Sequence, residues 1–373
     1  MRRLETSRML LAVAAATALA GVGAGPSGLV ATAATYPGEL SSSSPVAVVA
    51  SGLESPRSLA WGPDSHLLVA EAGTRPSVCS GTECYGLTGT ISDISSGTPV
   101  RIVTGLVSSS TGNVVGPSGL TYVDGQLYTL EAGSPQDVPL WLPKDLRKTL
   151  KDQAGALLDV TGGSISVVAN PGKVDYQWTE EHLELSAGDF EGNPYALTPN
   201  PGGGFYLADA GANTLDSVDE RGKVRVLAFI PPTPAGPDAV PTCLDVGTDG
   251  AVYVGELTGA RSSGTAASVY RYEPSSGSLT VWQSGFSAIT GCGFGANGDF
   301  YVTEFSTTGF PPAGPPAGVV IQISPDGTRT VLGAGQLFAP GGFLAGLDGS
   351  VYVANNIVFP GAGPRTGEVV KIG

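Results

Sequence analysis

A module of 15 or 16 residues recurs six times in this chain, and it constrains the fold more than any other feature. Each copy begins with Pro or Ile, continues with small and apolar residues and turns at Gly, Asp or Asn. It then ends in an apolar–aromatic run closed by an acidic residue or Asn. Five copies have the same length, and the second is one residue shorter at its turn. The copies span residues 56–71, 117–131, 194–209, 241–256, 289–304 and 340–355.

Each copy predicts two strands joined by a tight hairpin, because Asp-Gly, Asn-Gly and Gly-Gly supply the positive φ that such turns need. A second hairpin follows most copies, at 89–106, 213–230, 268–286 and 318–335. Four antiparallel strands make one propeller blade, and radially stacked blades cover each other's faces. The sequence therefore predicts an all-β, six-bladed β-propeller.

The two ends of the repeat region predict how the ring closes. The last unit finishes with a third strand at 367–373 and has no fourth strand after it. Residues 45–53 resemble 100–106, the strand that ends the first unit. We therefore expect the N-terminal strand to complete the last blade, which removes the open edges that invite aggregation.

The first 33 residues have the pattern of a secretory signal peptide. Arg2, Arg3 and Arg8 precede an apolar, alanine-rich run, and Ala31-Thr32-Ala33 supplies a small-residue cleavage motif. We therefore divide the chain into a signal peptide (1–33) and a propeller (45–373), and predict a secreted, extracellular protein. No later segment is long and apolar enough to predict a membrane span.

The charge of the chain excludes two classes of partner. Its formal net charge is −14, and the leader's three arginines and one glutamate mean that cleavage would leave −16. Such an acidic protein is not expected to bind nucleic acid or anionic lipid surfaces. A small molecule, a glycan or another protein remains possible as a partner.

The four cysteines fall into two pairs. Cys79 and Cys84 lie in a short loop sequence, so we predict that they form a disulfide in an oxidising compartment. Cys243 and Cys292 belong to adjacent modules, at the third and fourth positions. Because side chains alternate along a strand, these two point to opposite strand faces. We interpret them as two buried thiols, with a disulfide after local distortion as the alternative.

The loops predict two unlike faces. The turns within the hairpins are short, whereas the long insertions all fall on the opposite side of the ring, so we expect the functional site on the long-loop face. Two insertions predict helices, at 141–155 and 176–190, whose opposite charges suggest that they pack together beside blades two and three. Two mobile surface helices are the alternative.

The last residues of the six second strands are candidates for a ring around the channel mouth. Five carboxylates in such a ring would repel one another unless a cation or backbone donors compensate. They could bind Ca²⁺, or each could cap its own loop by accepting backbone N–H groups, which we favour. Arg57 and Tyr195 are further binding candidates at this mouth. The six ring residues are Glu71, Glu131, Asp209, Glu256, Glu304 and Asn355.

Familiar catalytic motifs are missing from the sequence. The chain has two histidines, His66 and His182, and neither has the context of a Ser-His-Asp triad. No phosphate-binding glycine loop, dinucleotide-binding glycine pattern or zinc-hydrolase motif occurs.

Several segments resemble the ScyD/ScyE family of exported bacterial proteins, which are similar to NHL-repeat propellers and are named after a scytonemin pigment gene cluster. The resemblance covers about residues 45–373 and implies secretion and six blades, without implying an activity. It is carried by 48–73, CYGLTGTI (84–91), EGNPYAL (191–197), LADAGANTL (207–215) and VPTCLDVGTDGAVYVGELTG (240–259).

Two functions follow from these features. The first is a non-catalytic exported module that binds a ligand or partner through the long-loop face, which we favour. The second is a Ca²⁺-dependent hydrolase or lyase, similar to lactonases or strictosidine synthase, with its site at the channel mouth. In that case the carboxylates, Tyr195 or Arg57 would have to supply acid–base catalysis.

Overall fold

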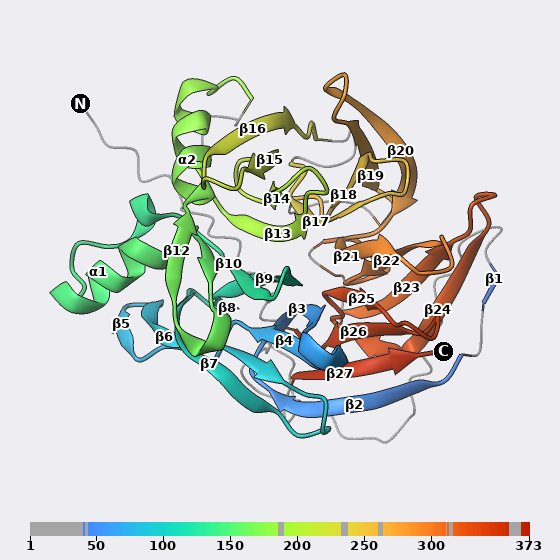
Figure 1. Ribbon diagram of the computed structural model, residues 1–373, viewed down its shortest axis with the longest axis horizontal. Coiled ribbons are helices and arrows are strands. Elements are labelled where there is room, and N and C mark those ends of the chain that lie inside the picture. The colour runs from blue at the N-terminus through green and yellow to red at the C-terminus, as the bar shows by residue number, and fades with distance from the viewer. Residues whose placement is uncertain are drawn as a thin grey trace, which may run out of the picture.

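The chain forms a closed ring of six β-sheets around a central axis, as the computed structural model in Figure 1 shows. The structure describes residues 40–41, 44–185, 190–232, 238–259, 264–310, 312, 316–357 and 367–373. The predicted signal peptide lies outside these residues. Each sheet contains four antiparallel strands in a row, so the predicted six-bladed β-propeller is confirmed.

The blades follow one another in sequence, and the strands of each run from the axis outward. The innermost strands are β3 (Pro56–Trp61), β9 (Pro117–Val123), β13 (Pro194–Pro199), β17 (Pro241–Val246), β21 (Ile289–Phe294) and β25 (Phe343–Ala345). The second strands are β4 (Leu67–Glu71), β10 (Gln126–Glu131), β14 (Phe205–Asp209), β18 (Val252–Glu256), β22 (Phe300–Glu304) and β26 (Val351–Asn355).

The outer half of each blade is the second hairpin. The third strands are β6 (Glu83–Asp93), β11 (Leu157–Asp159), β15 (Thr214–Val218), β19 (Ala267–Glu273), β23 (Ala317–Ile323) and β27 (Gly367–Ile372). The outermost strands are β7 (Val100–Ser110), β12 (Ser166–Ala169), β16 (Val224–Phe229), β20 (Ser278–Phe286), β24 (Arg329–Phe338) and β2 (Val46–Leu53). Three short strands add to blades one and five: β5 (Val78–Ser80), β8 (Val114–Val115) and β1 (Leu40–Ser41).

The N-terminal strand closes the ring, as predicted. β2 pairs antiparallel with β27, from Val46 opposite Ile372 to Leu53 opposite Gly367. The last blade therefore combines the two ends of the repeat region, and blue and red ribbons lie side by side in Figure 1. A feature that the sequence did not indicate is β1, which pairs in parallel with β24.

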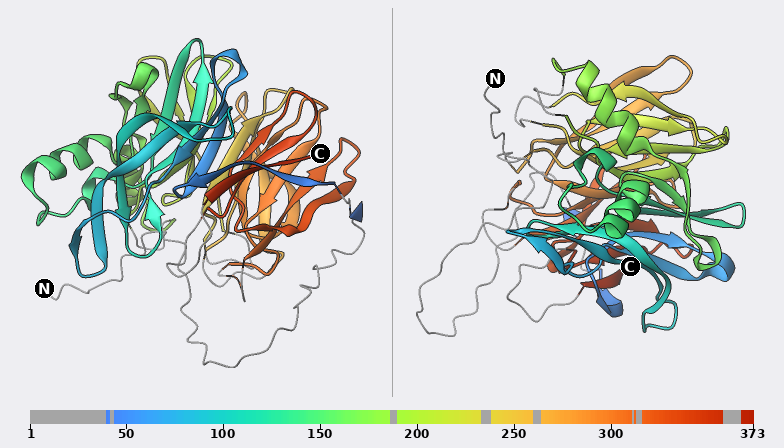
Figure 2. Two further views of the ribbon diagram at one scale, coloured as in Figure 1. Left: turned by 90° about the horizontal axis from the view of Figure 1, so that it is seen from below. Right: turned by 90° about the vertical axis from the view of Figure 1, so that its left-hand side faces the viewer.

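Two helices, one inserted before the third strand of blade two and one following its outermost strand, lie outside the ring (Figure 2). α1 (Lys144–Gln153) agrees with its prediction and packs on β7 and on the 3-10 turn η2 (Pro135–Asp137). α2 (Pro171–Glu181) packs on η2, β15 and β16, and it begins and ends earlier than the predicted 176–190. The start signal that we overlooked is Asn170-Pro171, in which the Asn170 side chain accepts the Lys173 N–H. Two further 3-10 turns are η1 (Pro63–Ser65) and η3 (Thr161–Gly163).

The hydrophobic core consists of six apolar layers, one in each gap between neighbouring blades. Because side chains alternate along the innermost strands, successive residues of a module enter different inter-blade layers. The fourth residue of each module packs toward the preceding blade, as Leu120 does in the layer between blades one and two. The third residue points toward the following blade. It must be small, because a Cβ on Gly342 would lie 2.2 Å from the backbone oxygen of Arg57.

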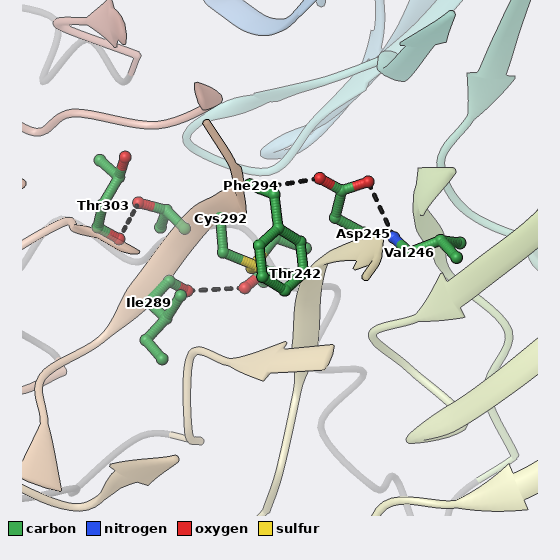
Figure 3. Close-up of a disulfide and its surroundings, with 9 residues drawn as sticks. Thr242, Asp245, Val246, Ile289, Cys292, Phe294 and Thr303 are labelled. Carbon is green, nitrogen blue, oxygen red and sulfur yellow. Dashed lines mark hydrogen bonds between the residues drawn. A yellow bond between two sulfur atoms is a disulfide. The ribbon is translucent and has the colours of Figure 1, made fainter. Parts of the chain in front are cut away.

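This alternation corrects the prediction for the second cysteine pair, because Cys243 and Cys292 form a disulfide (Figure 3). Cys243 points from blade four toward blade five, and Cys292 points from blade five back toward blade four. Neighbouring blades present opposite sheet faces to the gap that they share. Two cysteines on opposite strand faces of adjacent blades therefore point toward each other. Gly255 leaves room for the bridge: a Cβ there would lie 2.6 Å from the Cys243 sulfur.

The predicted disulfide between Cys79 and Cys84 is confirmed. The two residues are opposite each other in the β5–β6 hairpin of the first blade. As for membrane insertion, the helices among the described residues are all too short or too polar to cross a bilayer.

Candidate functional site

A cavity of about 400 Å³ runs along the propeller axis and is lined by the six innermost strands. We call it the axial cavity. It begins among the second residues of the modules and reaches the last residues of the first strands, including Trp61, Tyr122, Phe294 and Ala345. Those residues adjoin the short hairpin turns. The axial cavity therefore extends to the short-turn face, whereas the sequence led us to expect the site on the long-loop face.

The long-loop end of the axis holds apolar side chains. Most of them directly follow a second strand or precede a first strand of blades three to six, whereas Ala354 lies in β26 and Phe310 in the insertion after β22. The Tyr195 ring packs against them. Their number includes two phenylalanines. The cluster contains Ala210, Val240, Leu257, Ala288, Phe305, Phe310, Ala339, Ala354 and Ile357.

A smaller cavity of about 40 Å³ lies on this side, and six residues line both cavities. We call these six residues the partition layer, because they separate the two spaces. Of the predicted site residues, Arg57 and Tyr195 belong to it. The partition layer consists of Arg57, Ser118, Tyr195, Thr242, Thr290 and Ile357.

Arg57 ties the partition layer to two distant parts of the chain. Its guanidinium donates from Nη1 to the Ile357 carbonyl and from Nη2 to the Val114 carbonyl, both at 2.6 Å. The side chain is 9% exposed, and burial lowers the pKa of Arg57, partly offset by nearby Tyr195. A buried cation bound only to carbonyl groups is an unusual element for a structural layer, since buried charges are normally paired.

The hydroxyl groups of the partition layer join neighbouring blades. Thr242 donates to the Ile289 carbonyl at 2.6 Å, Thr290 to the Pro340 carbonyl at 2.8 Å, and Ser118 to the Pro194 carbonyl at 3.3 Å. Each bond reaches the first residue of the next module. We overlooked these residues in the sequence, although a polar second position in four modules was visible there.

Among the described residues that line the axial cavity, Asp245 is the acidic one. It accepts the backbone N–H groups of Phe294 and Val246, both at 2.8 Å, and thereby links blades four and five beside the disulfide (Figure 3). Burial raises the pKa of Asp245, and the two N–H groups partly offset this. Its role could not be predicted from the repeat, because the equivalent position in the other modules is not acidic.

The six predicted ring residues lie inside their own blades. The five acidic ones are 0% exposed and Asn355 is 2% exposed, and none of them is among the residues described as lining the axial cavity. Four of them accept a backbone N–H from the turn that enters the first strand. Glu71 binds the N–H of Glu54, Asp209 that of Asn193, Glu304 that of Ser287, and Asn355 that of Phe338.

Three of these turns contain a backbone conformation that needs support. The residue after the bound N–H has positive φ in each: 56° at Ser55 and 43° at both Ala288 and Ala339. Side chains with a Cβ rarely adopt this region. The acidic or amide side chain therefore holds a strained entry turn in place, as the capping interpretation predicts.

Glu131 and Glu256 differ from the other ring residues, because their carboxyl oxygens make no hydrogen bond. Burial raises the pKa of Glu131 well above its ordinary value and that of Glu256 to about 8. Ser268 lies close enough to Glu256 to lower its pKa slightly, but outside hydrogen-bonding geometry. Burial therefore favours the protonated form of both side chains, and this form predominates for Glu256 at pH 7.

The carboxylates of the ring do not form a calcium site in the part of the chain that the structure describes. No three His, Cys, Asp or Glu side chains there are grouped closely enough to hold a metal ion. Four of the six ring residues have oxygens occupied by backbone donors, and Glu131 and Glu256 favour the protonated form. The residues therefore do not fit Ca²⁺, and we do not carry that prediction further.

A buried carboxyl cluster that the sequence did not reveal fixes α2 to blade three. Asp175 of α2, Asp209 and Asp216 are each 0% exposed. Burial, and then the neighbouring Asp216 and Asp209, raise the pKa of Asp175 well above its ordinary value, so that the protonated form of Asp175 is favoured. The sequence pattern could not predict this cluster, because Asp175 belongs to an insertion and not to the repeat.

The histidines lie away from the axis. His66, in the first hairpin turn, contacts Asp93 through Nδ1 at 2.5 Å, and half of its side chain is exposed. His182 caps the end of α2 and stacks on Trp178, with ring centroids 4.3 Å apart. Neither arrangement resembles a catalytic triad, which needs a histidine between a nucleophile and a carboxylate.

Comparisons with known proteins agree on the fold alone. No family model matches the chain, and no curated protein matches its sequence. A gluconolactonase from Xanthomonas campestris has a similar structure, with a TM-score of 0.54 at 9% identity over 91% of this chain and 96% of that one. A candidate gluconolactonase gives a TM-score of 0.53 at 11% identity over the same shares. A candidate oxidoreductase (glucose dehydrogenase) from Thermus thermophilus gives 0.50 at 16% identity, over 88% and 99%.

Proposed function

We propose that this protein is an exported, non-catalytic binding protein that holds a small organic molecule in its axial cavity. The observation that carries the proposal is the cavity itself. Its volume of about 400 Å³ lies within the range of small-molecule sites. Its wall combines aromatic rings, such as those of Trp61 and Phe294, with the hydroxyls of the partition layer, so polar and apolar groups both face the cavity.

Export is supported by two independent features. The basic, alanine-rich N-terminus has the pattern of a signal peptide. The two disulfides fit an oxidising compartment outside the cytoplasm. Both agree with the proposed membership of the ScyD/ScyE family, whose proteins are exported.

The axial cavity places the proposed ligand site elsewhere than the sequence analysis did. We expected the ligand at a long-loop mouth ringed by carboxylates, but those carboxylates lie within the blades and apolar side chains occupy that end. The proposed site is therefore the axis itself, reached from the short-turn face. The Ca²⁺-dependent enzyme depended on the ring of carboxylates, and we do not propose it for this chain.

The experiment fills the cavity and measures binding of two aromatic probes. Indole-3-acetate and indole-3-acetamide are titrated calorimetrically into the oxidised protein and into Thr121→Trp, which places an indole ring in the cavity wall. We expect saturable binding of one or both probes to the wild type, and a loss of at least about tenfold in the variant.

The matched control is Leu347→Trp, which adds the same ring to an exposed residue of the short-turn face. It should bind both probes as the wild type does. If neither probe binds the wild type, or if both variants bind equally well, the axial cavity is not a ligand site.

A further inference from the structure

Arg57 carries a buried positive charge with which no carboxylate in the described part of the chain forms an ion pair. It lines both cavities, and the ion pairs found among the described residues do not include it. Its closest polar partners are the Ile357 and Val114 carbonyls. Carbonyl dipoles compensate a buried cation only partly, so the site favours an anion close to the guanidinium.

The guanidinium has donors left for such a group. Arginine has five N–H groups in a planar fork, and the two bonds to carbonyls use one each from Nη1 and Nη2. Three N–H groups remain. A planar anion with two oxygens matches this geometry better than a point acceptor does, which is why arginine commonly binds carboxylates in a bidentate manner.

A second donor at the same place also lacks an acceptor. Asn113 lines the smaller cavity together with Arg57, is 5% exposed, and its Nδ2 makes no hydrogen bond. A buried N–H without a partner costs about 1–3 kcal/mol, so an acceptor at this position would be stabilised. Arg57 and Asn113 together thus offer more N–H donors than the described acceptors around them use.

The rest of the axial cavity limits the ligand to one negative group. Arg57 and Asp245 are the charged residues among those described in its lining. Asp245 is three residues beyond Thr242 of the partition layer along β17, which corresponds to about 10 Å. An anionic group near that end would face the carboxyl of Asp245, whereas the aromatic rings of Trp61 and Phe294 in the lining suit an apolar body.

We infer that the ligand of the axial cavity is a small organic monocarboxylate, with its carboxylate on Arg57 and its apolar body directed toward Trp61 and Phe294. This inference rests on the proposed function. It adds the chemical class of the ligand and the residue that recognises it.

The test compares three probes of similar shape and different charge on the full protein. Indole-3-acetate, indole-3-acetamide and tryptamine are titrated into the wild type at pH 7. The anion should bind at least about tenfold more tightly than the amide, and the cation most weakly. Equal binding of the anion and the amide would overturn the inference and leave the proposed function intact. Binding of neither would overturn the proposed function itself.

Arg57→Gln then assigns the preference to this residue. The variant should lose at least about tenfold in affinity for indole-3-acetate and less than about threefold for indole-3-acetamide. Arg225→Gln, which removes the same charge from an exposed position on the outermost strand β16, should change neither. Equal effects of the two variants would refute the role of Arg57. If Arg57→Gln does not fold, the comparison of the three probes on the wild type still tests whether the cavity prefers a carboxylate.

Discussion

At the scale of residues, the last residue of the second strand has two different environments in this repeat. Glu71 and Glu304 accept backbone N–H groups and hold strained turns, whereas Glu131 and Glu256 are buried at the same position without a hydrogen bond. The difference arises in the preceding turn. Asp238 accepts the N–H of Ala239 in blade four, so the turn there has its own acceptor and Glu256 is left without a donor. Equivalent positions in a repeat therefore need not have equivalent roles.

The first prediction concerns pH and Glu256. Its pKa is about 8 in the folded state and about 4.5 when unfolded, so the folded state holds the extra proton between these values. Stability is then greatest below pH 4.5 and falls as the pH rises toward 8. Glu256→Gln removes this dependence. We expect little change in the free energy of unfolding at pH 5 and a gain of about 3 kcal/mol over the wild type at pH 8.

Urea denaturation at both pH values measures this difference. Glu304→Gln is the matched control, because Glu304 accepts the Ser287 N–H and its loss should destabilise by about 1–2 kcal/mol. A Glu256→Gln variant that is less stable than the wild type at pH 8 would show that Glu256 is ionised and paired in the folded protein.

At the scale of elements, the gap between two blades is the unit that holds the molecule together. Each gap contains an apolar layer from both neighbours, and inter-blade hydrogen bonds from Ser118, Thr242 and Thr290 run beside it at the axis. The gap between blades four and five also has the Cys243–Cys292 disulfide and the contacts of Asp245. This gap is therefore the most heavily cross-linked part of the ring's inner wall.

The second disulfide should consequently contribute more to stability than the first. Cys243 and Cys292 are 49 residues apart, and Cys79 and Cys84 are 5 apart. Because a longer closed loop removes more entropy from the unfolded chain, replacing the inter-blade pair by alanine should cost about 4 kcal/mol and the hairpin pair about 2 kcal/mol. Thermal unfolding of the two double variants tests this. A smaller loss for the inter-blade pair would show that the apolar layer holds the gap without it.

At the scale of the whole molecule, closure by β2 decides whether the ring is a single cooperative unit. β2 contributes Ala50 and Leu53 to the layer between blades six and one, so it joins the two ends in packing as well as in hydrogen bonding. Without β2, β27 would be an open strand edge next to an incomplete layer.

A chain that begins at residue 55 should therefore lose cooperative unfolding and aggregate. The control begins at residue 44, which keeps β2 and removes only the predicted leader and β1. We expect the control to unfold in one transition and to elute as a compact species in size-exclusion chromatography. Equal melting temperatures for the two chains would mean that β2 is not part of the stable ring.

The sequence was sufficient for the architecture because the repeat is local. Six in-phase hairpins, an unmatched third strand at 367–373 and an N-terminal segment like a fourth strand together predict six blades and their closure. The disulfide between Cys79 and Cys84 was equally predictable, since both residues lie in one hairpin. These features depend on turn chemistry and on the alternation of side chains within a blade.

The tertiary structure alone decided what happens between blades. The Cys243–Cys292 bridge depends on two blades turning opposite faces to one gap, and the position of Asp175 depends on where an insertion folds back. The acidic ends of the second strands looked like a ring in the sequence. Their direction depends on the turns they support, and most of them support their own blade. The axial cavity, with Arg57 at one end and Asp245 toward the other, exists only because six separate strands surround one axis.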